Sequence, residues 1–271
     1  MTADSHPRSG NAPGAPAAPA PPAGRSGDPE RALRVLWRTD ERASRKNKPE
    51  LHVDRIVGTG IALADAHGLD ALSMRRVATE LGVGTMSLYT YVPGKDELLE
   101  AMLDAAYAET AGPERADGGW RAHLEDVARE NLALYQRHPW VLRLVTGRPV
   151  LGPGELAKYD HEIRGLDGIG LTDVEMDAVL TLVLGHVQSV ARVDLDARQS
   201  VTSSGESDAQ WWDARAPLLE TFFDSARYPV AARVGQAVGE AHGAAQSAAY
   251  AFEFGLHRIL DGVETLLHSR R

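Results

Sequence analysis

The stretch "ALSMRRVATELGVGTMSLYTYVPGKDELL", residues 71 to 99, decides the fold of this chain. Ser73 is placed to cap a short helix that runs from Met74 to Leu81, and Gly82 ends that helix. After a short turn, Thr85 is placed to cap a second helix that ends at Tyr91, before Pro93 and Gly94. Two short helices with a glycine-containing turn predict a helix-turn-helix, in which these side chains face inward: Val77, Leu81, Val83 and Leu88.

A phosphate-binding loop is the alternative interpretation of the same stretch, because it ends in Pro93-Gly94-Lys95. Such a loop needs the pattern GxxxxGK[ST] between a strand and a helix. Here Asp96 follows the lysine, Tyr89 stands where the earlier glycine should be, and the preceding segment is helical in pattern. The sequence therefore excludes a nucleotide-binding loop of this type.

The second helix carries hydroxyl and apolar side chains rather than charges. Its hydroxyl groups can bond to base edges or phosphates, and the Met86 side chain can contact a thymine methyl group. Lys95 begins the next helix and Arg75 lies on the first one, so both are expected to contact phosphates. The residues predicted to contact DNA in this region are Arg75, Thr85, Met86, Ser87, Tyr89, Thr90, Tyr91 and Lys95. No Arg, Asn or Gln occupies the second helix, so the sequence of the bound DNA cannot be read from it.

The charge of the chain is unevenly distributed. The net charge is −9, but residues 31–95 hold 11 Lys and Arg against 7 Asp and Glu, a balance of +4, whereas residues 96–271 carry −12. A basic segment on an acidic body is typical of a protein that binds a polyanion at one end. Arg45, Lys46 and Lys48 form either a basic arm that contacts DNA or a solvated linker, and both interpretations stay open.

The rest of the chain is divided into a tail and a helical body. Residues 1–48 are predicted to be a disordered tail rich in Pro and Ala, with a possible short helix over 29–39 and the basic arm. Residues 49–110 hold the helix-turn-helix domain, and residues 111–271 form a larger helical domain. The body shows amphipathic patterns over 119–138, 140–146, 172–193, 208–226, 230–241 and 245–268. No alternating pattern of strand length interrupts them, so the fold class is all-α.

Several classes of protein are excluded by composition. The chain has no Cys, so disulfides and Cys-ligated zinc are excluded. No run of about 18 apolar residues and no signal-peptide core is present, which predicts a cytoplasmic protein without a membrane partner. The segment "DHEIR" at 160–164 lacks the second His of a zinc helix. We therefore expect no enzyme activity, no bound metal and no cofactor.

The segment "LSMRRVATELGVGTMSLYTYVPGKDELLEAM" resembles the DNA-binding domain of the tetracycline-repressor (TetR) family, over about residues 50 to 108. Three further segments, "RHPWVLRLVTGRP", "LGPGELAKYD" and "FEFGLHRILDGVETLL", resemble the ligand-binding and dimerisation domain of its tetracycline-repressor branch. The resemblance implies a regulator that binds double-stranded DNA at a palindromic operator as a homodimer. It further implies that the regulator represses transcription and is released by a small-molecule effector, which the sequence does not identify. An activator, a regulator controlled by a protein partner, and a helical enzyme or binding protein with a vestigial DNA-binding domain remain as alternatives.

Two sets of residues in the body are candidates for effector binding and for dimerisation. Polar or aromatic side chains on apolar faces are candidates for the effector pocket, or else are buried groups with partners of their own: Asn131, His138, Trp140, Arg143, His186 and Trp211. The resemblance implies a four-helix bundle between two copies, built from the apolar faces of the last helices, although such a face can equally be monomer core. The candidate dimer residues are Leu218, Phe222, Phe252, Leu256, Ile259, Leu260, Val263 and Leu267.

Overall fold

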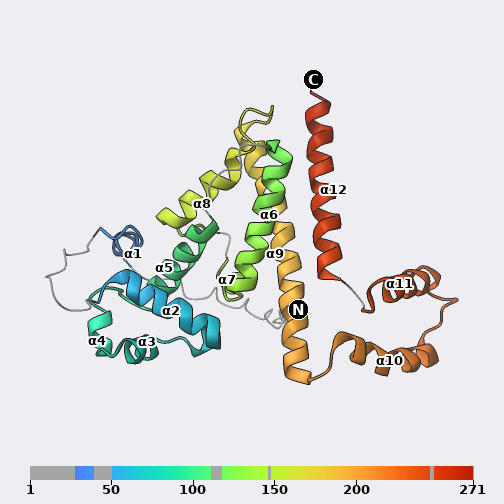
Figure 1. Ribbon diagram of the computed structural model, residues 1–271, viewed down its shortest axis with the longest axis horizontal. Helices are drawn as coiled ribbons and strands as arrows, with labels where there is room; N and C mark the ends of the chain where they lie inside the picture. Colours follow the sequence, from blue (N-terminus) through green and yellow to red (C-terminus); the bar gives the residue numbers. More distant parts are fainter. Residues whose placement is uncertain (1–27, 40–50, 111–117, 146–147, 245–246, 271) are drawn as a thin grey trace, which may run out of the picture.

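The computed structural model describes residues 28–39, 51–110, 118–145, 148–244 and 247–270 (Figure 1). All regular elements within these ranges are helices. The N-terminal part consists of α1 (Pro29–Leu36), α2 (Val53–His67), α3 (Met74–Leu81), α4 (Thr85–Leu88) and α5 (Lys95–Tyr107). The body consists of α6 (Gly119–Arg137), α7 (Val141–Leu144), α8 (Pro153–Arg164), α9 (Asp173–Ser204), α10 (Asp208–Phe222), α11 (Pro229–His242) and α12 (Ala248–His268). Short 3-10 turns follow α2 and α5, η1 at Leu69–Ala71 and η2 at Ala108–Thr110.

Helices α2 to α5 form a small domain around one apolar core. α2 packs against α3 and α5, and α3 packs against α4. Fully buried side chains of this core come from different parts of the domain and include Ile56, Val77, Leu88, Val92 and Leu98. Each contributes about 1.5–3 kcal/mol by leaving water. α5 extends out of the domain and packs against α8, so it connects the two parts of the chain (Figure 1).

The body is built around the long helix α9. α6 and α12 both pack along α9, and α8 lies across the end of α5. The crossing of α9 and α12 is close at Gly255, where an added Cβ would lie 2.2 Å from the His186 ring. Only glycine allows this approach, and His186 uses it to place Nε2 3.0 Å from the Phe252 carbonyl oxygen.

By length and mean hydropathy, α9 passes the test for a helix that could cross a membrane. Core helices of soluble proteins pass the same test. α9 packs against α6 and α12, and seven of its side chains are buried: Met176, Val179, Leu180, Val183, Val187, Val190 and Ala191. These contacts agree with a core helix.

Helix α8 was absent from the amphipathic patterns of the sequence. Pro153 stands in its first turn, as is favourable at a helix start. Its buried positions include Lys158, His161 and Glu162, so the buried face is polar and no apolar stripe marks it. This polar face also explains why hydrophobic periodicity did not predict the helix.

Helices α10 and α11 lie to one side of the body, between the ends of α9 and α12 (Figure 1). None of their described side chains is buried. Leu218 and Phe222, two candidate dimer residues, are 61% and 84% exposed. These two residues are therefore not part of the core of the described chain.

Candidate nucleic-acid interface

The turn between α3 and α4 is fixed by local hydrogen bonds. The Ser73 hydroxyl accepts a hydrogen bond from the Arg76 backbone N–H at 3.2 Å, which caps α3 as the sequence predicts. Gly82 ends α3 in the left-handed region, at φ +68° and ψ +30°. Its N–H donates to the Thr79 carbonyl, so the chain reverses within a few residues. This geometry sets α4 across α3.

The second helix is shorter than the sequence predicts. α4 covers Thr85–Leu88, Gly84 occupies the N-cap position, and no described side chain caps the helix, so the predicted cap by Thr85 is wrong. The backbone continues as turns, because the N–H groups of Tyr91 and Val92 both donate to the Leu88 carbonyl, at 2.9 and 2.8 Å. The Leu88 side chain is fully buried and anchors the segment to the domain.

The outward face of this segment has little charge. Met86 is 78% exposed and Tyr89 38% exposed, and Ser87 and Thr90 are exposed as well. Thr85 is half-buried, and Tyr91 is half-buried against the core. The face therefore offers hydroxyl groups and one thioether at the surface, which suits hydrogen bonding and methyl contacts in a DNA groove.

Cationic side chains flank this face. Arg75, Arg76 and Lys95 are all exposed. Lys95 is the first residue of α5, and no described side chain caps that helix start, so its first N–H groups point outward. A lysine beside an open helix start is suited to a phosphate. The predicted basic arm residues Arg45, Lys46 and Lys48 lie outside the described residues.

Three predicted effector residues instead join the small domain to the body. Asp65 of α2 lies 2.8 Å from His138 Nδ1 and accepts a hydrogen bond from Trp140 Nε1 at 2.7 Å. Arg143 donates to both oxygens of Asp70, at 3.0 and 2.9 Å. The hydrogen bonds and charge of Arg143 hold the pKa of the Asp70 carboxyl below its usual range. These contacts fix how the small domain sits relative to the body.

A buried polar cluster lies where α5, α6 and α8 meet. Asn131 is fully buried, and its Nδ2 donates to the Val127 carbonyl at 2.9 Å and to Glu162 Oε1 at 2.5 Å. Lys158 donates to the same Glu162 oxygen at 2.5 Å, and its ammonium lies 5.3 Å from the centre of the Tyr107 ring. Asn131 Oδ1 has no hydrogen-bond partner among the described residues. A buried acceptor without a donor is costly, and so is uncommon in folded proteins.

Two phenols border the same region. Burial raises the pKa of Tyr135 to about 12 and raises that of Tyr107 further. Both are neutral hydroxyl groups at pH 7, as tyrosines ordinarily are, and can donate hydrogen bonds. Of the predicted effector residues, Asn131 alone belongs to this cluster. Glu162, Lys158 and the two tyrosines were not predicted as site residues. For Lys158 and Glu162, the i, i+4 spacing of a lysine and a glutamate on one helix was a signal in the sequence.

The remaining predicted residues lie elsewhere. His186 is part of the contact between α9 and α12, and Trp211 of α10 is 44% exposed and stacked on Trp212. The structure places five candidate dimer residues in the core of one chain: Phe252, Leu256, Leu260, Val263 and Leu267. They face the body because α12 packs on α9, so they offer no surface to a second copy. Ile259 is half-buried.

Within the part of the chain that the structure describes, no three His, Asp or Glu side chains gather into a set that could hold a metal ion.

Two family models match the chain. Residues 56–102 match the model described as bacterial regulatory proteins of the tetR family. Residues 112–267 match the model of the tetracyclin repressor-like C-terminal domain. The two matches follow the division between the small domain and the body.

Individual relatives agree with these matches. The transcriptional repressor DrrR1 of Streptomyces coeruleorubidus is 46% identical over 248 residues, which cover 91% of this chain and 89% of that protein. The class A tetracycline repressor of Escherichia coli is 27% identical, over 79% of this chain and 91% of that protein. The crystal structure of ActR from Streptomyces coelicolor in complex with actinorhodin has a TM-score of 0.65 and 29% identity, and covers 79% of this chain and 96% of ActR. The chain thus belongs to the tetR family and is a DNA-binding transcriptional regulator, not an enzyme.

Proposed function

We propose that this regulator is a repressor that binds a palindromic operator as a homodimer in the cytoplasm and leaves it when a small molecule binds. The observation that carries the proposal is the exposed, nearly uncharged face of α4 between Arg75 and Lys95. Such a face reads base edges, while its flanking cations bind the phosphates. The name of the 46% identical relative as a repressor supports the direction of control.

The effector site we propose is the polar cluster around Asn131. The unpaired Oδ1 of Asn131 favours a ligand that donates a hydrogen bond. Lys158 and the protonated phenols of Tyr107 and Tyr135 supply donors for carbonyl or hydroxyl oxygens of the same ligand. Because Lys158 and Glu162 belong to α8, a ligand that competes for them moves α8 relative to α5.

Release then follows from thermodynamic linkage. The effector must bind the arrangement that does not fit the operator more tightly than the one that does. The operator must weaken effector binding by the same factor. The contacts of Asp65 and Asp70 with the body provide a physical connection between the two sites.

For the dimer we propose the outer faces of α9 and α12 in place of the buried residues. α6 covers the other side of α12, where Arg121 bonds to Asp261 and Glu264. The outer faces carry small and apolar side chains that are exposed or half-buried: Ala178, Leu182 and Gly185 on α9, and Ile259, Gly262 and Leu266 on α12. Open space surrounds the Cβ positions of both glycines, so a second pair of helices can approach closely.

Leu182→Arg is expected to convert the dimer into a monomer. Leu182 is 59% exposed in one chain, so the substitution leaves the monomer core intact. It places one arginine from each copy, and so two positive charges, in the proposed interface. Sedimentation velocity measures the change in mass. Val201→Arg, on a 40% exposed side chain further along α9, is the matched control. A Leu182→Arg protein that remains a dimer at micromolar concentration would place the interface elsewhere.

Lys95→Ala is expected to weaken binding to all DNA sequences alike. A phosphate contact contributes affinity but no sequence information, so the slope of log K against log salt should fall by about 1. Fluorescence anisotropy over a salt series measures both quantities. Unequal losses for operator and random DNA would contradict the phosphate role and indicate a base contact.

The proposed function itself is tested on the DNA upstream of the protein's own gene. The dimer should shift this DNA in preference to random DNA, and transcription from it should fall in a reconstituted assay. Actinorhodin, the molecule bound in the ActR structure, is the first probe for release. A rise in transcription would indicate an activator, and equal binding to all DNA would refute the proposed regulator.

A further inference from the structure

Helix α1 lies outside both stretches that match the family models, 56–102 and 112–267. It is nevertheless attached to the fold, because α1 packs against α5, and Val35 and Leu36 are 7% and 2% exposed. A helix of eight residues is marginal by itself in water. Its position therefore depends on these contacts with the rest of the chain.

Polar bonds hold α1 at each end. At one end, Arg31 Nη2 donates to the Tyr89 carbonyl at 3.2 Å, directly after the last residue of α4. At the other end, Trp37 Nε1 donates to the Leu151 carbonyl at 3.1 Å. Arg38 adds a bond to Asp54 of α2 at 2.8 Å. α1 thus contacts both the body and the end of α4, which is the recognition helix of the proposed DNA interface.

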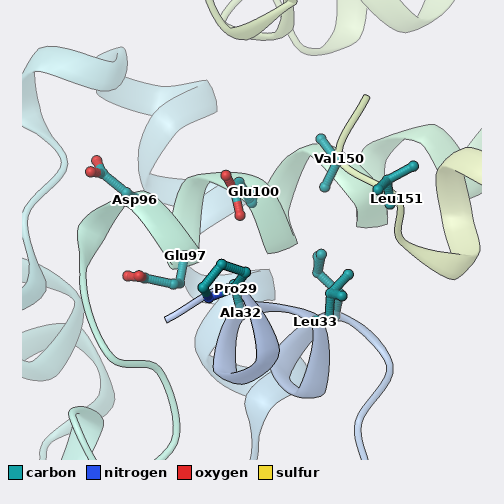
Figure 2. Close-up of a pocket in the computed structure, with 9 residues that line it drawn as sticks. Pro29, Ala32, Leu33, Asp96, Glu97, Glu100, Val150 and Leu151 are labelled. Atoms are coloured by element: carbon teal, nitrogen blue, oxygen red, sulfur yellow. The ribbon is translucent and has the colours of Figure 1, made fainter. Parts of the chain in front are cut away.

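The packing between these ends is incomplete. A cleft of about 250 Å³ separates α1 from part of α5 and from Val150 and Leu151 (Figure 2). Pro29, Ala32 and Leu33 face it from α1, and Asp96, Glu97 and Glu100 lie on its α5 side. Apolar contact along α5 is interrupted at this cleft, and the polar bonds at the two ends add to the positioning of α1.

The body end of α1 is connected to α8. Leu151 has φ +63°, which is strained for a residue with a side chain, and its N–H donates to Glu155 Oε2 at 2.8 Å. The backbone N–H of Glu155, in the first turn of α8, donates to Asp104 of α5 at 2.9 Å. A shift of α8 therefore moves the Leu151 carbonyl, to which Trp37 is bonded.

We propose that α1 is a strut between α8 and the recognition helix, in which Arg31 is a positioning residue for the end of α4. α5 also connects the body with the small domain. α1 provides a second connection, because Arg31 bonds to the Tyr89 carbonyl at the end of α4 and not to the core of the domain. Its role in release rests on the proposed effector site, whereas its effect on α4 does not. The competing interpretation is that Arg31, which is exposed, binds a DNA phosphate itself.

Arg31→Ala in the full chain separates these interpretations. If Arg31 positions α4, amide exchange over residues 85–92 should rise in hydrogen–deuterium exchange, while exchange in α2 stays unchanged. Affinity for the upstream DNA should fall by roughly tenfold with an unchanged salt slope. Unchanged exchange together with a slope reduced by about 1 would make Arg31 a phosphate contact and overturn the proposal. Arg34→Ala removes the same charge from the same helix, together with a bond to Glu30 within α1 rather than a bond to α4, and should leave exchange over 85–92 as it was.

Trp37→Phe tests the other end of the strut. The substitution removes the N–H donor to Leu151 and keeps an aromatic ring on a side chain that is 48% exposed. Exchange should rise both over 148–156 and over 85–92, although the recognition helix is not touched directly. A rise confined to 148–156 would show that α1 does not transmit the change. These measurements need no operator, so they stand even if the upstream DNA proves not to be the target.

Discussion

Glu162→Ala is expected to lower the free energy of unfolding by about 3–5 kcal/mol, because it leaves the buried Lys158 ammonium without its counter-ion. The side chains of Lys158 and Glu162 are 8% and 2% exposed, so water cannot replace the lost carboxylate. Asn131 Nδ2 loses an acceptor in the same substitution. Guanidinium unfolding followed by circular dichroism measures the change.

The control for Glu162→Ala is the double variant Lys158→Met with Glu162→Leu. Replacing both charges with apolar side chains of similar volume is often neutral or stabilising, because neither ion then has to leave water. The double variant should unfold close to the wild type, but it should no longer respond to an effector that uses these groups. If Glu162→Ala changed stability by less than about 1 kcal/mol, the ion pair would not hold α8 in place.

Leu88→Ala is expected to destabilise the small domain by about 2–5 kcal/mol and to abolish specific DNA binding. The Leu88 side chain is fully buried and is the only buried side chain among the residues of α4, so its removal leaves a cavity beneath the recognition helix. Hydrogen–deuterium exchange over 53–107 and a mobility shift measure the two effects.

Met86→Ala on the same helix is the matched control. Its side chain is 78% exposed, so stability should change by less than about 0.5 kcal/mol while operator affinity falls. If Leu88→Ala and Met86→Ala had equal effects on unfolding, the inward and outward faces of α4 would be wrongly assigned.

The small domain could be predicted because its signals are local. Ser73 and Gly82 set the ends of α3 through bonds to residues three positions away, which a sequence displays directly. The length of α4 was overestimated, since the turns from Tyr89 to Tyr91 continue the helical path without helical hydrogen bonding throughout.

The body could be predicted only in outline, because its deciding contacts are distant in sequence. His138 and Arg143 were predicted as effector residues because they are polar side chains in otherwise apolar helical segments. Their partners, Asp65 and Asp70, lie more than seventy positions earlier, so the sequence does not display these contacts. The apolar stripe of α12 identified buried residues such as Leu256 correctly as apolar contacts, but a stripe does not show whether its partner is the same chain or a second copy. α8 escaped prediction because its buried face carries an ion pair.

The outward face of α4 carries little charge, and this affects how quickly the protein finds its target. Non-specific attachment to DNA depends almost entirely on phosphate contacts, and in the proposed interface the exposed cations Arg75 and Lys95 would supply them. Residues 96–271 carry −12 and repel the duplex. Residence on random DNA should therefore be short, so that the time spent on each of the many competing genomic sites is small. With this charge distribution, we expect the search for the operator to proceed by frequent dissociation and rebinding.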